Sequence, residues 1–362
     1  MVFSEKSVAV VVASIVVAHQ HNDRPFTSLF LSVSSVPLCW VWTLEFEMCG
    51  SWRLDKQHIN TYRTDGLLKA PFRIPDDQLG RMRESLDKLL RDNSHLAPET
   101  LVCPHIPYGK THDETAAAQW LEYARHPGIL ELVSQLIGED IVLWGSQVFC
   151  KPPVTGKAIP WHQDGQYWPI RPIATCSVWI ALDDALPENG CMRYIPGSHA
   201  NGSIYTHRIN ERDDVVLNQE VEPSQFDESS GRDDALKAGE FSLHDVYLIH
   251  GSNANHSSNR RAGFVIRYMP ATSVFERAAG DEHVQSGITF SMSRRPIWLL
   301  RGMDRSGRND FSIGHGKHYA LMPQVSDEEG AEPEYSYAPR RASSGWLFSL
   351  SIRRTGTSRR FV

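Results

Sequence analysis

The order of the elements that the sequence predicts indicates a mainly β protein with flanking helices, in which a β-sandwich or barrel forms the core. Three observations support this fold class. Apolar residues recur at helical spacing before residue 140, the period changes to two after Asp140, and clusters of Pro, Gly and Asn separate the later segments. Helices followed by many short strands are typical of a sheet core that helices cover on one side.

Three helices are expected ahead of the strands. The first begins at residues 75–77, where a proline and two aspartates form a helix start. Its apolar face would contain Leu79, Met82, Leu86, Leu89 and Leu90. Two more helices are expected over 113–125 and 128–137, divided at His126-Pro127 because the residue before a proline disfavours the α conformation.

Five strands are expected after the helices. They cover residues 141–151, 173–183, 191–195, 241–250 and 263–269. Turn clusters at 187–190 and 196–198 separate some of them, and the alternation of apolar and polar residues within each segment has the strand period of two.

The strand over 173–183 has two different faces. One face is apolar, with Cys176, Val178, Ile180 and Leu182, and the other is polar and aromatic, with Thr175, Ser177 and Trp179. The second face could meet solvent, or it could form the wall of a polar cavity in a buried sheet. The short separation in sequence from His162 and Asp164 favours the cavity wall.

The composition is that of a globular protein with a sizeable core. At 362 residues the chain can form one large domain or two ordinary ones, since all-β barrels often exceed 200 residues. A net charge of −6 gives no basic surface overall, which argues against nucleic acid as a partner. The six cysteines include no CxxC pair, so we expect reduced thiols in an intracellular protein, several of them buried.

The two ends of the chain differ from its middle. We expect a poorly ordered or wrongly predicted extension over 1–50, a folded domain over 51–325 and a disordered tail over 326–362. The apolar run at 8–18 is too short to span a bilayer but has the length of a signal-peptide core. A cytoplasmic protein without stable membrane insertion is therefore expected, with secretory targeting as the alternative; the oligomeric state has no sequence signal.

The residues with the clearest chemistry are His162 and Asp164. In an extended strand, residues i and i+2 face the same side, so both side chains can point at one ion. A third ligand such as the distant His250 would complete the two-histidine, one-carboxylate triad that holds Fe(II) on one face and leaves about three positions open. His244 and His256 flank His250 and are alternative third ligands.

Several motifs in order resemble the phytanoyl-CoA dioxygenase family of Fe(II)/2-oxoglutarate oxygenases. The similarity extends from about residue 54 to 318 and includes Leu300-Arg301-Gly302-Met303-Asp304 near its end. The matching segments are His162-Gln163-Asp164, Ser177 to Leu182, Glu188 to Cys191, Tyr194 to His199, His250-Gly251-Ser252 with Asn255, Arg260-Arg261 and Arg267-Tyr268. The resemblance implies a double-stranded β-helix, the jelly-roll architecture of cupin-like proteins, and a catalytic domain of this kind over 51–325.

The resemblance also implies roles for particular residues. His162, Asp164 and His250 would bind the metal, since only His250 has the Ile-His-Gly-Ser context, while His244 would pack behind the ligands and His199 would be structural. Arg261 would hold the distal carboxylate of 2-oxoglutarate through two parallel donors, with Arg260 as the alternative. The remaining cosubstrate contacts would be Gln147, Gln163, Thr175 and Trp179, with His105 or Lys110 as an upstream contact.

The substrate would meet an aromatic cluster beside the metal ligands. Trp161, Tyr167 and Trp168 are either core residues or the substrate wall, and the sequence favours neither. The implied reaction is hydroxylation of an unactivated C–H bond in a small, apolar metabolite, with O₂ as cosubstrate and with 2-oxoglutarate converted to succinate and CO₂. The carboxylate of Asp164 favours an oxygenase, because related halogenases have a small residue at this position.

Two other kinds of protein remain as alternatives. Two histidines and a carboxylate also suit zinc, so a different mononuclear metalloenzyme on the same barrel, such as a zinc hydrolase or a manganese cupin, is one of them. The other is a binding module that keeps the fold without catalysis, against which His162, Asp164, His250 and Arg261 argue together.

Overall fold

The computed structural model describes residues 52–98, 101–107, 114–277, 282–285, 288–293, 295–313 and 315, together with two short strands further on. These strands are β18 (Pro339–Ala342) and β19 (Gly345–Phe348). The predicted extension over 1–50 lies outside the described residues, as does the rest of the predicted tail over 326–362. In the described part of the chain, every helix is too short or too polar to cross a membrane.

Among the described residues, four helices precede most of the strands: α2 (Lys56–Asp65), α3 (Asp76–Asp92), α4 (Glu114–Ala124) and α5 (Pro127–Ile137). The last three confirm the predicted helices to within two residues, and Leu79, Met82, Leu86 and Leu89 form the buried face of α3 as expected. Helix α2 was not predicted. Its ends are set by Asp55, whose carboxylate accepts a hydrogen bond from the His58 amide at 2.8 Å, and by Gly66, which has a left-handed φ of 81°.

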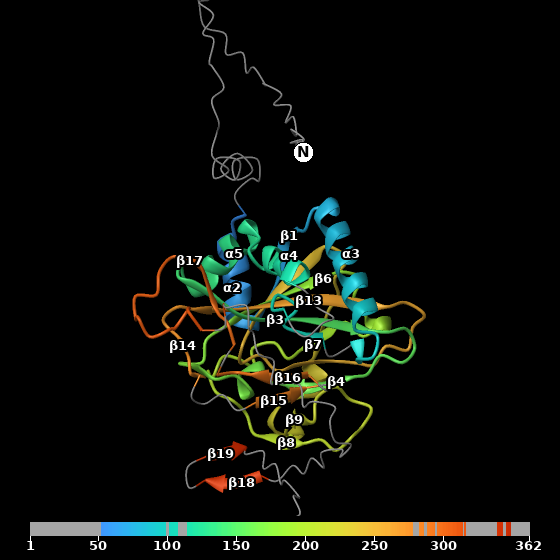
Figure 1. Cartoon of the computed structure of the whole chain (residues 1–362). Helices are drawn as coiled ribbons and strands as arrows, with labels where there is room; N and C mark the ends of the chain where they lie inside the picture. The colour runs from blue at the N-terminus through green and yellow to red at the C-terminus, as the bar shows by residue number, and fades with distance from the viewer. Residues whose placement is uncertain are drawn as a thin grey trace, which may run out of the picture. The chain divides into compact units, whose positions relative to one another are not determined.

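Two main sheets form the centre of the described residues. The larger one has seven antiparallel strands in the order β1-β11-β6-β13-β3-β17, with β2 also paired to β3. Their bounds are β1 (Leu67–Arg73), β2 (Leu101–Val102), β3 (Ile141–Lys151), β6 (Cys176–Ala181), β11 (Glu240–Asp245), β13 (Arg261–Pro270) and β17 (Trp298–Arg301). Figure 1 shows the helices gathered on one side of this sheet.

The smaller sheet has four antiparallel strands in the order β10-β7-β12-β4. They are β4 (Ile159–His162), β7 (Met192–Tyr194), β10 (Arg232–Asp234) and β12 (His250–Ser252). Four further strand pairs join β5 (Ile170–Arg171) to β14 (Val274–Phe275), β8 (His207–Ile209) to β9 (Gln219–Val221), β15 (Glu282–Gln285) to β16 (Ile288–Ser291), and β18 to β19. Two facing antiparallel sheets with helices on one side confirm the predicted fold class.

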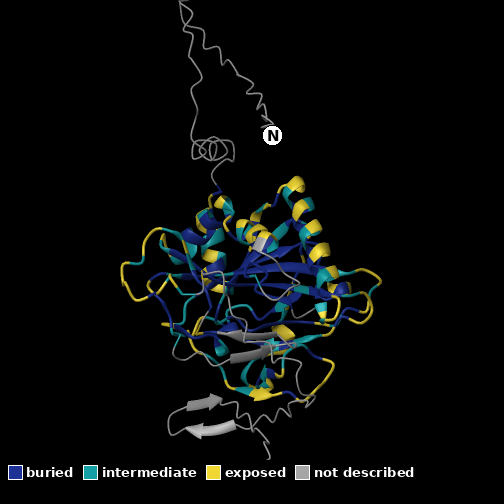
Figure 2. Ribbon diagram, in the orientation of Figure 1, coloured by how far each residue is buried: buried dark blue, intermediate teal, exposed yellow. Residues whose placement is uncertain are grey.

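The strands of the larger sheet separate an apolar layer from a more polar interior. On β13, Phe264 and Ile266 pack with helix residues in the main core, while Arg261, Val265 and Arg267 face the smaller sheet. Figure 2 shows that the central strands of the larger sheet consist almost entirely of buried residues, whereas exposed residues lie mainly on the outer turns of helices and on loops. On β6, Val178 packs in the main core and Trp179 on the opposite face, as the alternation predicts.

The prediction of one strand over 241–250 is wrong. Strand β11 ends at Asp245 in the larger sheet, and β12 begins at His250 in the smaller sheet. Asp245 turns the chain between them, because its carboxylate accepts a hydrogen bond from the Tyr247 amide at 2.8 Å. The segment therefore crosses from one sheet to the other immediately before the predicted metal ligand.

Candidate metal centre

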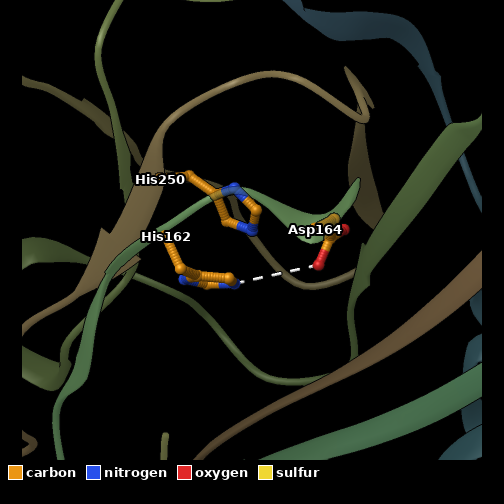
Figure 3. A group of neighbouring side chains, drawn as sticks. All are labelled: His162, Asp164 and His250. Carbon is orange, nitrogen blue, oxygen red and sulfur yellow. Dashed lines mark ion pairs between the residues drawn. The ribbon is translucent and has the colours of Figure 1, made fainter. Parts of the chain in front are cut away.

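Three predicted ligands lie together at one edge of the smaller sheet. His162 ends β4 and His250 begins β12, and the two residues are direct partners in the antiparallel register. Such a pairing places the two Cβ atoms roughly 5 Å apart, and the ring centroids of these histidines are 4.2 Å apart. Their donor atoms and a carboxylate oxygen of Asp164 all lie within 4.8 Å of one another, as Figure 3 illustrates.

Asp164 reaches this position from a turn and not from a strand. Strand β4 ends at His162, and Asp164 begins the 3₁₀ turn η3 (Asp164–Gln166), so the prediction that both side chains lie within one strand is wrong in this detail. Gln163 between them is extended, with φ −116° and ψ 130°. This one extended residue keeps the i and i+2 side chains on the same side.

Backbone carbonyl groups fix the proton on each imidazole. The Nδ1 atom of His162 lies 2.9 Å from the carbonyl oxygen of Pro160, and that of His250 lies 3.0 Å from the carbonyl oxygen of Leu248. Because a carbonyl oxygen only accepts hydrogen bonds, each Nδ1 carries the proton and each Nε2 keeps a free lone pair. Both Nε2 atoms are therefore prepared to bind a cation.

The charges in this cluster also suit a divalent cation. Burial, together with the neighbouring charge of His162, lowers the pKa of His250 to about 3, so its ring is neutral at physiological pH. Burial opposes the ionisation of Asp164, but interactions with His162 and His244 outweigh it and hold the pKa of this carboxyl well below its usual range. Two histidines and one carboxylate are the donor set of the Fe(II) facial triad.

A row of polar side chains on the larger sheet supports Asp164 from behind. In the register of β11, β6 and β13, His244, Ser177 and Arg267 lie side by side. The hydroxyl of Ser177 donates to Oδ2 of Asp164 at 3.4 Å, and Nε2 of His244 lies 3.6 Å from the same oxygen. His244 thus orients the carboxylate from the opposite sheet. The other alternative third ligand, His256, is exposed on a loop.

The metal cluster faces a cavity between the two sheets. Its polar lining includes His162, Asp164, His244, His250, Arg261 and Arg267, and its apolar lining includes Phe149, Ile159, Trp179, Met192 and Val265. The empty space between these residues, counted with the open mouth of the cavity, is about 430 Å³.

The two neighbouring arginines of β13 have different surroundings. Arg261 is only 2% exposed, its guanidinium lies 5.5 Å from the centre of the Trp179 ring, and no acidic side chain of the described residues pairs with it. Burial lowers its pKa to about 10, which still leaves it cationic at neutral pH. Arg260 instead donates to both carboxylate oxygens of Asp183, at 2.8 and 3.1 Å, and to Asp87 at 2.9 Å.

Three other residues predicted to contact the cosubstrate lie outside the cavity lining. The side chain of Gln163 binds backbone groups of Ser203, Tyr205 and Tyr247. Gln147 accepts a hydrogen bond from Arg267 at 2.9 Å and so reaches the cavity only through that side chain. Thr175 is buried just before β6. Of the upstream candidates, His105 lies 2.6 Å from the Ser146 hydroxyl, and Lys110 is outside the described residues.

The aromatic cluster is likewise packed away from the cavity lining. Trp168 is buried against Trp144, with ring centroids 4.4 Å apart, and contacts the site through Arg267 above its ring. The Trp161 and Phe226 rings are 5.7 Å apart, and Tyr167 meets His207 at 6.5 Å. The cavity walls that the sequence reasoning missed include Phe149, Met192 and Arg267. For Arg267 a signal was available, since it is six residues after Arg261 on a predicted strand and therefore on the same face.

Comparisons with known proteins agree with this geometry. The phytanoyl-CoA dioxygenase (PhyH) family matches residues 62–263, more than half of the chain. A probable phytanoyl-CoA dioxygenase of Caenorhabditis elegans is 30% identical over 287 residues, which cover 68% of this chain and 91% of that protein.

A second relative is a probable alpha-ketoglutarate-dependent hypophosphite dioxygenase of Stutzerimonas stutzeri. It is 33% identical over 149 residues, so the match spans 41% of this chain and about half of that protein, 51% of its length. Among solved structures, the apo form of the non-heme monooxygenase ThoJ aligns with a TM-score of 0.53 and 25% identity, over 68% of this chain and 84% of that one.

The predicted family and class of enzyme are thereby confirmed, together with the cofactors that define the class, Fe(II), 2-oxoglutarate and O₂. A cavity lined by two histidines, a carboxylate and a buried arginine is what these cofactors require. The chain belongs to the phytanoyl-CoA dioxygenase family and is a 2-oxoglutarate-dependent dioxygenase.

Proposed function

We propose that this protein hydroxylates a C–H bond of a small metabolite. In the balanced reaction, one atom of O₂ enters the new hydroxyl group and the other enters succinate, while 2-oxoglutarate loses CO₂. The observation that carries the proposal is the convergence of His162, Asp164 and His250 with the buried Arg261 in one cavity.

Each residue has a separate task in this reaction. His162, Asp164 and His250 would hold Fe(II), which supplies the oxidising chemistry once O₂ is bound. Arg261 would bind the distal carboxylate of 2-oxoglutarate, because its planar guanidinium is cationic, buried and available for two parallel hydrogen bonds. Trp179 would form the wall beside that carboxylate, since the Arg261 guanidinium lies against its ring.

The remaining walls favour a substrate with an apolar body. Phe149, Ile159, Met192 and Val265 line the cavity and exclude water from the reacting carbon. The relative from Stutzerimonas stutzeri is named for a very small substrate, hypophosphite, which agrees with a compact site. The proposed substrate is therefore a small molecule and not a group on a protein or nucleic acid.

The test measures succinate formation from 2-oxoglutarate in air with added Fe(II), in the wild type and in Asp164→Ala. The variant removes the only anionic ligand of the cluster, so we expect it to lose at least tenfold in iron content and to lose coupled turnover. A matched control is Asp184→Ala, which removes a half-exposed carboxylate paired with Lys237 and should behave as the wild type. Full activity in Asp164→Ala, or turnover supported by zinc alone, would contradict the proposal.

A further inference from the structure

A second, partly buried arginine lies in the same cavity without a matching negative charge. Arg267 lines the cavity from β13, and its Nη2 atom donates to the neutral amide oxygen of Gln147 at 2.9 Å. Its guanidinium lies 5.2 Å from the centre of the Trp168 ring and 6.0 Å from that of Trp144. Its buried Nε atom has no hydrogen-bond partner among the described residues.

The charges of the loaded site leave Arg267 uncompensated. The two positive charges of Fe(II) and that of Arg261 balance the two carboxylates of 2-oxoglutarate and that of Asp164. Asp164 is the acidic group that acts on Arg267 through space, but it does not form an ion pair with it, and in the loaded site its charge belongs to the metal. Arg295 adds a like charge nearby, because it too lies against Trp144, at 5.9 Å. A buried charge is costly unless it is paired.

The position of Arg267 separates it from the cosubstrate end of the cavity. Arg261 and Arg267 are six residues apart on one strand, so their Cα atoms are roughly 20 Å apart at the usual rise per residue. Arg267 is the register partner of Ser177, whose hydroxyl binds Asp164, whereas Arg261 lies against Trp179. The two guanidinium groups therefore serve different sides of the metal cluster.

We propose that Arg267 binds the anionic group of the primary substrate, so that the substrate is a small oxyanion, a carboxylate or a phosphorus oxyanion, with a compact apolar body. This inference rests on the proposed function and names the substrate class of the same site. The guanidinium has five N–H donors in a planar fork that matches two oxygens of such an anion. Phe149, Ile159 and Met192 would then contact the apolar body while the anion fixes which carbon faces the metal.

The test is a direct binding measurement that does not require turnover. Calorimetric titrations are made without oxygen on the protein loaded with Fe(II) and 2-oxoglutarate, using hexanoate, hexanamide, hexylphosphonate and hexan-1-ol as probes. In the wild type, each anion should bind at least tenfold more tightly than its neutral counterpart. Comparison of hexanoate with hexylphosphonate distinguishes the two sources of the oxyanion. Equal binding of anions and neutral probes would overturn the proposal without any variant.

Variants then assign the preference to one side chain. Arg267→Met and Arg267→Gln should reduce anion binding on the order of ten- to a hundredfold, the value of a lost charge-assisted hydrogen bond, and circular dichroism checks that each is folded. The matched control is Arg193→Met, which removes an arginine that lies 5.3 Å from the Trp161 ring outside the cavity lining and should keep the anion preference. If the Arg267 variants weaken 2-oxoglutarate and leave the probes unaffected, Arg267 belongs to the cosubstrate site and the proposal is wrong. Absence of wild-type succinate formation in air would instead contradict the proposed function.

Discussion

Replacing Arg261 by lysine tests the cosubstrate site most sharply, because an adjacent arginine provides the control. Arg261 is almost completely buried and faces the cavity, whereas Arg260 is half-buried and held by Asp183 and Asp87. A lysine keeps the positive charge at either position but cannot reproduce two parallel hydrogen bonds. Losing one charge-assisted hydrogen bond in a buried pair costs roughly 1.5–3 kcal/mol, which corresponds to about a ten- to hundredfold rise in the KM for 2-oxoglutarate.

The assay measures this KM through succinate formation and measures iron content separately. Arg261→Lys should keep its iron, since it is not one of the three ligands. Arg260→Lys should leave the KM nearly unchanged and cost at most about 1 kcal/mol of stability, the range for partly exposed ion pairs. If Arg260→Lys raises the KM and Arg261→Lys does not, the inward and outward faces of β13 must be exchanged.

Three further substitutions have defined outcomes. Burial raises the pKa of Asp234 to about 6 from the usual 3.8, so the folded protein favours its neutral form, and stability is lost as pH rises from about 4 through about 6. In urea unfolding, the free energy of unfolding of Asp234→Asn relative to that of the wild type should therefore rise by about 2–3 kcal/mol between pH 4 and pH 7. A difference between the two proteins that does not change with pH would contradict this. A Cβ at Gly263 would lie 2.2 Å from the Trp179 ring, so Gly263→Ala should push the ring toward the cavity and raise the KM for 2-oxoglutarate. A Cβ at Gly80 in α3 would have no atom within 4 Å, so Gly80→Ala should stabilise the protein by roughly 0.5–1 kcal/mol in thermal unfolding. A lower stability of this variant would show that the added methyl group clashes with a neighbour.

The sequence predicted those parts of the fold that depend on local periodicity. The bounds of β3 were predicted to the residue, because this strand lies between two layers and ten of its eleven residues are buried. The break between β11 and β12 was not predicted, since Val246, Leu248 and Ile249 are as apolar as a strand and all are buried. The turn is formed by a short-range contact, the hydrogen bond from the Tyr247 amide to the Asp245 carboxylate, and one aspartate is too weak a signal in the sequence to mark a change of sheet.

In the site, too, the features visible in the local sequence pattern were predicted, and those that depend on the folding of loops were not. His162, Asp164, His250 and Arg261 were predicted as site residues from their spacing and motif context, and the structure brings all four to one cavity. The placement of Gln163 and Trp161 was beyond sequence reasoning, because both depend on loops whose folding cannot be derived from local pattern. Gln163 binds three backbone groups of those loops, and Trp161 meets Phe226, which is more than sixty residues further along the chain.

The Gln163 side chain donates a hydrogen bond to the Tyr247 carbonyl oxygen at 2.6 Å, and this contact bears on how substrate specificity can change in such enzymes. It joins the residue between His162 and Asp164 to the turn that precedes His250, so it holds the spacing of the three predicted metal ligands. The residues that would discriminate between substrates, Val265 and Arg267, lie on a strand of the larger sheet. We therefore expect substitutions at Val265 and Arg267 to change which molecule is oxidised while the geometry of the three predicted iron ligands is preserved, so that selection can act on the two sheets separately.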